Sequence, residues 1–182
     1  MTDLSDFFIY DPDTGIVRHN PDRPRDTFPT DIGYKRWKSR CSGKITGSKR
    51  GGGYLGINMK SMGVSFSIHR IALMLSGIEI PEGYEVDHID GCKTNNKLEN
   101  LRVVTRAVNA KNRALQQNNK SGAVGVHWCK TAEKWRATIK VSRIKIHLGS
   151  FEDKEEAIEA RKEAEIKYGF HENHGRIGEQ YD

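Results

Sequence analysis

The sequence lacks a long apolar run, a secretory leader and any close pair of cysteines. Its longest run of Ile, Ala, Leu and Met is residues 71–75, far below the roughly 20 apolar residues of a membrane-spanning helix. Residues 1–6 have neither the basic start nor the apolar stretch of a secretory signal. Cys41, Cys92 and Cys129 form no Cys-x-x-Cys pair, so neither a structural zinc site nor a disulfide framework is predicted. These absences predict a soluble, cytoplasmic protein that needs no membrane.

Positive charge is in excess. The chain has 30 Lys and Arg against 24 Asp and Glu, a net charge of +6 and a pI near 9.2. Such a balance favours a polyanionic partner, namely DNA, RNA or an acidic membrane surface, although an ordinary basic protein has the same balance. With 36% hydrophobic residues in a chain of 182, we expect small modules and no single large core.

The first 50 residues are predicted to form a basic, loop-rich segment with turns at residues 11–15 and 21–24. No acidic residue occurs between residues 33 and 50. The cations of that stretch form a candidate phosphate-binding arm: Lys35, Arg36, Lys38, Arg40, Lys44, Lys49 and Arg50. A charge run has no geometry of its own, so a solvated and mobile loop explains the same residues.

Residues 51–114 are predicted to form a second module. Apolar residues alternate with polar or small ones around a turn at 61–63, which predicts a hairpin with one buried face: Leu55, Ile57 and Met59, then Val64, Phe66 and Ile68. Residues 69–76 are predicted to form a short helix that Gly77 closes. In that helix, we favour His69 as a packing residue over a ligand.

The most informative pattern is Asp87-His88 followed by Asn100 and Asn109. Residues 85–89 and 101–104 are predicted as strands joined by a loop, and Thr105 as the cap of a helix that contains Asn109. A ββα unit of that kind can bring side chains of the strands and of the helix together.

These residue types suit the hydrolysis of a phosphodiester. The imidazole of His88, with an unperturbed pKa of about 6.5, can take a proton from water at physiological pH. Asp87 and Asn109 offer hard oxygen ligands of the kind that Mg²⁺ prefers. Turns and helix caps are an alternative explanation for the Asp and Asn residues, but they do not explain an Asp-His pair on a strand.

The stretch from residue 53 to residue 112 resembles the HNH nucleases, in the form that many phage and homing endonucleases carry. The resemblance implies that Asn100 orients His88 through a hydrogen bond. The last histidine of the family motif is replaced by Asn109, as in the homing-type subset. An amide oxygen favours Mg²⁺, with Mn²⁺ possible, over zinc or nickel.

After a polar linker at residues 115–122, residues 123–175 are predicted to form a three-stranded antiparallel sheet packed on one helix, with 176–182 as a tail. Alternation places apolar residues on one face of the sheet: Val124, Val126, Trp128, Trp135, Ala137, Ile139, Val141, Ile144, Ile146 and Leu148. The opposite face carries polar and mostly cationic residues: His127, Lys134, Arg136, Thr138, Lys140, Arg143, Lys145 and His147. A merely solvated surface is the alternative explanation of the cationic face.

This third module resembles the plant ethylene-response-factor (APETALA-type) DNA-binding domain over residues 121–174. The segments that carry the resemblance are Gly125-Val126-His127-Trp128, Lys134-Trp135-Arg136-Ala137 and Leu148-Gly149-Ser150-Phe151. The resemblance implies that the sheet enters the major groove of DNA. Arg136 and Arg143 are the expected base readers, and further DNA contacts are expected from His127, Thr138, Lys140, Lys145 and, before the linker, Arg113.

The chain is therefore predicted to have an α+β fold and to be a metal-dependent, site-specific endonuclease acting on double-stranded DNA. One site per chain cuts one strand, so a monomer nicks, and a double-strand break needs a homodimer or two events. The alternative is a sequence-specific DNA-binding regulator with an inactive nuclease centre. The expected setting is the cytosol of a phage-infected or bacterial cell.

Overall fold

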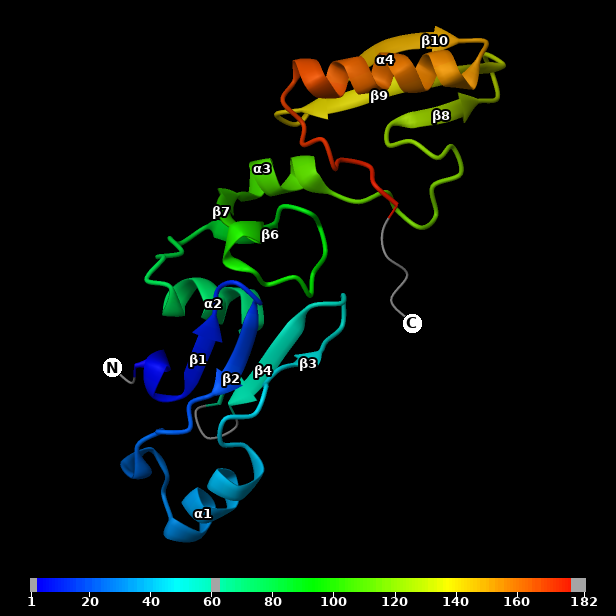
Figure 1. Cartoon of the computed structure of the whole chain (residues 1–182). Helices are drawn as coiled ribbons and strands as arrows, with labels where there is room; N and C mark the ends of the chain where they lie inside the picture. The colour runs from blue at the N-terminus through cyan, green and yellow to red at the C-terminus, as the bar shows by residue number, and fades with distance from the viewer. Residues whose placement is uncertain (1–2, 60–62, 178–182) are drawn as a thin grey trace. The chain divides into compact units, whose positions relative to one another are not determined.

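A computed structural model of the chain describes residues 3–59 and 63–177 and has a mixed α+β fold (Figure 1). The chain divides into two compact units, Met1–Val104 and Thr105–Asp182, which we name unit 1 and unit 2. The sequence places module boundaries after residues 50 and 114, whereas the units divide after residue 104. The difference arises because residues on both sides of each expected boundary pack together.

Unit 1 consists of small antiparallel sheets and helices. β1 (Phe8–Asp11) pairs with β2 (Ile16–His19), while β3 (Ser48–Lys49), β4 (Leu55–Met59) and β5 (Val64–Ser67) form a three-stranded sheet. One buried cluster joins both sheets to helix α2 (Ile68–Leu75): Phe7, Phe8, Val17, Ile57, Met59, Ile68 and Ile71. The first 50 residues are thus part of the fold of unit 1.

A helix occupies part of the stretch that the sequence predicted to be loop-rich. α1 (Asp31–Arg40) begins after Thr30, whose Oγ1 accepts a hydrogen bond from a backbone N–H three residues on, at 3.1 Å. Trp37 of α1 packs against Phe28, and the guanidinium carbon of Arg23 lies 4.1 Å from the ring centre of Phe28 and 4.2 Å from that of Phe7. The expectation of loops was wrong for this stretch because cation–π and aromatic contacts hold α1, which has no regular apolar stripe.

The predicted hairpin and short helix are confirmed, but the predicted buried face is wrong at Val64, which is 41% exposed, and Ile68 is the first residue of α2. β4 and β5 pair antiparallel, with Ile57 opposite Phe66 and Met59 opposite Val64. Of the predicted turn, Ser61 and Met62 lie outside the described residues. α2 follows β5 directly and ends before Gly77, whose φ of +72° lies in the left-handed region that favours glycine.

The predicted strand pair of the motif is also confirmed. β6 (Tyr84–His88) and β7 (Leu101–Thr105) form a two-stranded sheet, and the loop between them ends in a 3₁₀ turn at Leu98–Asn100. Buried Val86 and Leu101 pack with Ala72 and Leu73 of α2. This packing holds the end of β6, where Asp87 and His88 lie, against the helix.

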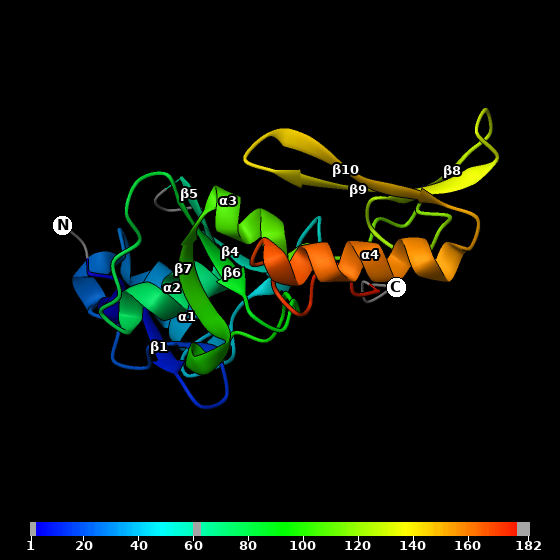
Figure 2. The ribbon, with the colours of Figure 1, turned by 90° about the horizontal axis from the view of Figure 1, so that it is seen from above.

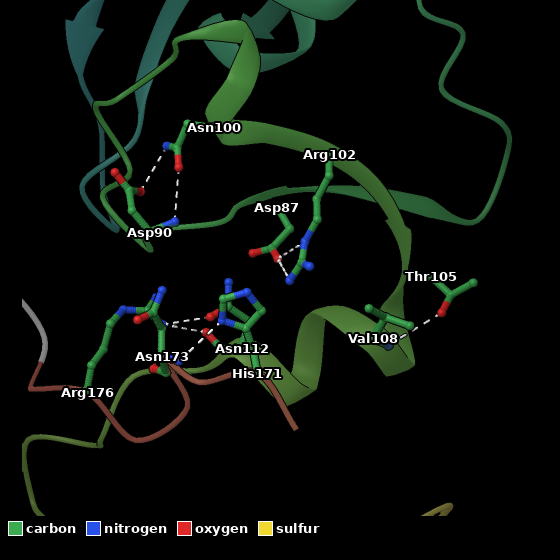
Figure 3. Close-up of polar contacts among 10 residues, drawn as sticks. All are labelled: Asp87, Asp90, Asn100, Arg102, Thr105, Val108, Asn112, His171, Asn173 and Arg176. Carbon is green, nitrogen blue, oxygen red and sulfur yellow. Dashed lines mark hydrogen bonds and ion pairs between the residues drawn. The ribbon is translucent and has the colours of Figure 1, made fainter. Parts of the chain in front are cut away.

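Unit 2 begins with α3 (Arg106–Asn109), which continues as a 3₁₀ turn at Ala110–Asn112. Thr105 caps α3 as predicted, because its Oγ1 accepts a hydrogen bond from the Val108 N–H at 3.4 Å (Figure 3). β8 (Val126–Cys129), β9 (Lys134–Val141) and β10 (Ile144–Phe151) form an antiparallel sheet in the order β10-β9-β8. Helix α4 (Lys154–Lys167) covers one face of this sheet, which confirms the predicted architecture (Figure 2).

The predicted apolar face of this sheet is correct at its centre and wrong at its ends. Val126, Ala137 and Ile139 are buried, whereas Trp128 and Ile144 are 45% and 67% exposed. Trp128 stacks edge-on against Trp135 at 5.4 Å between ring centres, and only Trp135 packs on the buried cluster. Both exposed residues lie towards the ends of strands, where little of the chain covers them.

The expected linker is a packed part of unit 2. The backbone N–H of Leu115 donates to the carbonyl of Arg176 at 2.8 Å, and the N–H of Gly175 donates to the carbonyl of Arg113 at 2.9 Å. Further on, the Asn119 side chain closes a turn by accepting from the Gly122 N–H at 2.7 Å. Among the residues that the structure describes, no helix combines the length and the apolar character needed to cross a membrane.

Candidate active site

His88 is the last residue of β6 and is 4% exposed. Its ring lies edge-on to that of His69, with 5.2 Å between ring centres, and 5.9 Å from that of Tyr54. Burial lowers the pKa of His88 below its ordinary value, against opposing effects of Asn96 and two aspartates. The imidazole is therefore neutral at physiological pH, which is the form that can accept a proton.

Asn96 defines the tautomer of that imidazole. Its Nδ2 donates to the carbonyl of Thr94 at 3.1 Å, so its Oδ1 is the atom that faces His88 Nε2, also at 3.1 Å. An oxygen accepts, so Nε2 carries the proton and Nδ1 carries the lone pair. A base with its lone pair on Nδ1 follows from this contact.

The N-terminal hairpin supports Asn96, which is 2% exposed. The hydroxyl of Tyr10 donates to the Asn96 carbonyl at 2.7 Å. At the turn between β1 and β2, a Cβ built on Gly15 would lie 2.5 Å from the backbone nitrogen of Lys97 and 2.6 Å from the carbonyl carbon of Asn96. Sequence analysis did not single out Asn96, because it lies in an Asn-rich loop and the residues that support it are more than 80 positions away.

Asn100 organises the loop between the two strands (Figure 3). Its Oδ1 accepts from the Asp90 N–H at 3.0 Å, and its Nδ2 donates to Asp90 Oδ1 at 2.9 Å and to the Asn95 carbonyl at 2.8 Å. In addition, the Asn100 carbonyl accepts from the backbone N–H of Ile89 at 2.9 Å. These bonds close the loop that carries Asn96. Asn100 therefore helps to orient His88 indirectly, because Asn96 of this loop contacts His88. The predicted side-chain bond from Asn100 to His88 stays a prediction.

Asp87 is 7% exposed and is paired with Arg102 of β7 (Figure 3). Its Oδ2 accepts from Arg102 Nε at 2.9 Å and from Nη2 at 2.7 Å. A carboxylate buried to this extent needs a cation or hydrogen-bond donors, and here the guanidinium provides both. Sequence reasoning missed Arg102, although its position on the strand that pairs with β6 is the signal that could have found it.

Asn109, the other predicted metal ligand, lies at the end of α3 in unit 2 and is partly buried. A carboxylate oxygen and an amide oxygen are the chemistry that Mg²⁺ or Mn²⁺ takes, so the donor types of Asp87 and Asn109 fit such an ion. That both residues bind one ion stays a prediction.

His69, on α2, is buried, and its Nδ1 has no hydrogen-bond partner among the described residues. Burial, followed by the nearby His88 and Arg70, lowers the pKa of His69 from 6.5 to about 4. The ring packs edge-on against those of His88 and Tyr54. His69 is thus a neutral neighbour of the candidate base.

The predicted DNA-binding residues of unit 2 lie together on the face of the sheet away from α4. His127 pairs with Arg136 across the strands, Thr138 with His147, and Lys140 with Lys145. Cross-strand partners share a face, so these side chains form a continuous basic ladder. Several other predicted contact residues are exposed: Arg143 and Arg113 in unit 2, and Lys35, Arg36, Lys38 and Arg40 on α1 in unit 1.

Parts of the chain are similar to known proteins. Residues 67–111 match the family described as HNH endonuclease. Protein 3.8 of Escherichia phage T7 is 43% identical over 60 residues, which are 33% of this chain and 50% of that protein. A solved structure of DNA binding and cleavage by the HNH homing endonuclease I-HmuI is 29% identical, covers 58% of this chain and 51% of that chain, and has a TM-score of 0.39.

The chain thus spans about half the length of each of these two proteins. The family match supports an HNH endonuclease domain in residues 67–111. The matched segment contains His69, Asp87, His88, Asn100 and Asn109.

Proposed function

We propose that the chain is a metal-dependent DNA endonuclease that hydrolyses one phosphodiester bond per active site, in a phage or homing setting inside the cell. The observation that carries the proposal is a buried, neutral His88 whose Nε2 is held by Asn96, directly after a buried carboxylate. His88 can act as this base only if a water molecule and the phosphodiester that it attacks come close to Nδ1.

In the proposed reaction, Nδ1 of His88 takes a proton from the attacking water. The water oxygen forms a bond to phosphorus as the bond from phosphorus to the leaving deoxyribose oxygen breaks. General-base help of this kind contributes roughly 10² to 10⁴ in rate. Asp87 and Asn109 would hold Mg²⁺ or Mn²⁺, which supplies neutralisation of the charge that grows on the phosphate and the leaving oxygen.

We further propose that the sheet of unit 2 reads DNA as an ethylene-response-factor-like domain. Its basic ladder supports the proposal, because two lysines directly opposite each other repel unless an anion lies between them. Arg136 and Arg143 are the proposed base readers, since a guanidinium can bond two atoms of a guanine edge.

A nicking assay on supercoiled plasmid with Mg²⁺ or Mn²⁺ tests the nuclease. We expect the wild type to cut and His88→Ala to lose roughly 10² to 10⁴ in rate while it still binds DNA. Lys162→Ala is the control, because it changes an exposed residue of α4 that lies outside both the candidate site and the basic ladder. Equal cutting by His88→Ala and the wild type would show that His88 is not the base.

A DNA-binding regulator with an inactive nuclease centre is the second candidate. The observation that favours it is the doubly bonded Oδ2 of Asp87, because a guanidinium there competes with a metal ion. The same plasmid assay separates the two candidates. A regulator binds DNA but does not cut it, whichever metal ion is added and at whatever concentration.

A further inference from the structure

We infer that unit 2 binds the sugar–phosphate backbone of a nucleic acid in a cleft between residues 106–116 and the free part of β9. The inference rests on the proposed function and deepens it, because it adds a concave surface that shares Lys140, Arg143 and Lys145 with the predicted DNA-binding residues and extends them to Arg106 and Lys111. Every residue of this cleft belongs to unit 2.

The cleft exists because β8 is shorter than β9. β8 pairs only with residues 134–137 of β9, and the N–H of Thr138 donates to the Gly125 carbonyl at 2.9 Å, so the free part of β9 is residues 139–141. Residues of α3 and of the segment after it line the cleft together with that free part of β9 and the turn that follows it. The cavity volume is about 1270 Å³, far more than one side chain fills.

The lining is cationic, and no carboxylate occurs in it within residues 3–59 and 63–177. Its positive side chains come from three places in the chain and include Arg106, Lys111, Arg113, Lys140, Arg143 and Lys145. Apolar residues such as Ile139, Val141 and Ala107 lie between them. Cations of one sign around a concave apolar floor attract an anion with repeated charges, and a nucleic acid releases counterions when such residues neutralise its phosphates.

Backbone strain at the rim is an independent observation. Ser142 and Arg143, the two central residues of the β9–β10 turn, have φ of +49° and +71°. Hairpin turns of this kind favour Asn-Gly, because side chains with a Cβ are strained in the left-handed region. An arginine at a position that favours glycine indicates that its charge at the mouth of the cleft has a use beyond the turn.

A nucleic acid fits these observations better than a peptide. An acidic peptide could add a strand at the free part of β9, but it would not need cations on the opposite wall at Arg106 and Lys111. α3 also carries Asn109, the proposed metal ligand, so a backbone in the cleft passes along the helix from which that ligand comes.

The test is binding of the full chain to a fluorescent 30-base-pair duplex in EDTA, measured by anisotropy over a range of salt concentrations. If Arg143 contacts a phosphate in the cleft rather than the base proposed above, Arg143→Gly should bind roughly 3- to 10-fold more weakly and lower the salt slope by about 1. Its melting temperature should be at least that of the wild type, because glycine relieves the left-handed strain. A variant that is at least as stable and binds less cannot be explained by misfolding.

A second variant probes the opposite wall, and a third controls for net charge. Arg106→Gln should weaken binding and lower the slope as Arg143→Gly does. Lys162→Gln removes the same charge from an exposed position of α4 outside the cleft and should leave binding within twofold of the wild type. If Arg143→Gly and Arg106→Gln both bind duplex with the wild-type affinity and slope, the inference is overturned.

Two further outcomes are distinguishable. If instead a fluorescent poly-glutamate peptide binds and Arg106→Gln weakens only that peptide, the cleft takes acidic protein segments and the inference also fails. Because binding is measured without metal, weaker binding by the cleft variants supports the cleft even when the wild type cuts no plasmid. If the wild type cuts plasmid but the cleft variants bind duplex normally, the nuclease proposal holds and the cleft inference fails.

Discussion

Replacing Asn96 with aspartate would test the assignment of the base through its pH dependence. In the wild type, burial lowers the pKa of His88, so the neutral and active form persists below pH 6.5. A carboxylate 3.1 Å from Nε2 would stabilise the imidazolium, and an opposite charge at such a distance raises a histidine pKa by roughly 1 to 3 units. We expect the acid limb of the rate to move up in pH by a similar amount.

Asn96→Ala provides the matched measurement. It removes the acceptor without adding charge, and loss of one hydrogen bond of roughly 0.5–1.5 kcal/mol should slow the reaction roughly 2- to 13-fold. The acid limb of the Asn96→Ala rate should not show the upward shift in pH that is expected for Asn96→Asp. The assay is the single-turnover rate of plasmid nicking at saturating enzyme and metal between pH 5.5 and 9. If Asn96→Asp keeps the wild-type acid limb, Asn96 does not contact the catalytic base and the tautomer argument fails.

Two further predictions concern the neighbours of His88. Arg102→Ala should tighten Mn²⁺ binding, measured by electron paramagnetic resonance, because the guanidinium no longer competes for Asp87 Oδ2. The same change should lower the free energy of unfolding by roughly 1–3 kcal/mol. An unchanged Mn²⁺ affinity would show that Asp87 is not a metal ligand. His69 has a pKa of about 4 in the folded chain and 6.5 in the unfolded chain, so it binds fewer protons in the folded state. Its contribution to the free energy of unfolding is therefore fully present above pH 6.5 and is lost as the pH falls towards 4. That loss amounts to about 3 kcal/mol in the free energy of unfolding, measured with urea. If the stability of His69→Phe depends on pH as that of the wild type does, the prediction is wrong.

Local patterns of the sequence predicted the elements that depend on alternation and capping. The β4–β5 hairpin, the β6–β7 pair, the Thr105 cap and the sheet and helix of unit 2 all follow from regular spacing within single elements, of which the longest, α4, has 14 residues. In each case, one face of a strand or helix is buried against a neighbour that is close in the chain. Such spacing is visible in the sequence because the buried face repeats with the period of the element.

Contacts between distant residues could not be predicted in this way. Tyr10 and Asn96 are 86 positions apart, and Arg102 meets Asp87 across 15. Buried Arg161 likewise donates to the carbonyl of Thr138 at 2.7 Å and to Glu165 Oε1 at 2.8 Å, so a long charged side chain fills a buried position of helix α4. A polar residue that satisfies its bonds inside a fold has the same letter as one on the surface, so composition and periodicity do not distinguish them.

The motif residues are divided between the two compact units, and this division bears on how the nuclease can be dissected. Asp87, His88 and Asn100 belong to unit 1, whereas Asn109 lies in unit 2. Three positions after Asn109, the Asn112 side chain is 3% exposed, and its carbonyl and Oδ1 accept from Nη1 of Arg176 at 2.8 and 3.0 Å. A chain cut after residue 114, where the sequence pattern places the end of the nuclease, would leave Asn112 without that partner and α3 without its support. The helix that supplies the second proposed metal ligand therefore depends on the C-terminal part of the chain for its support.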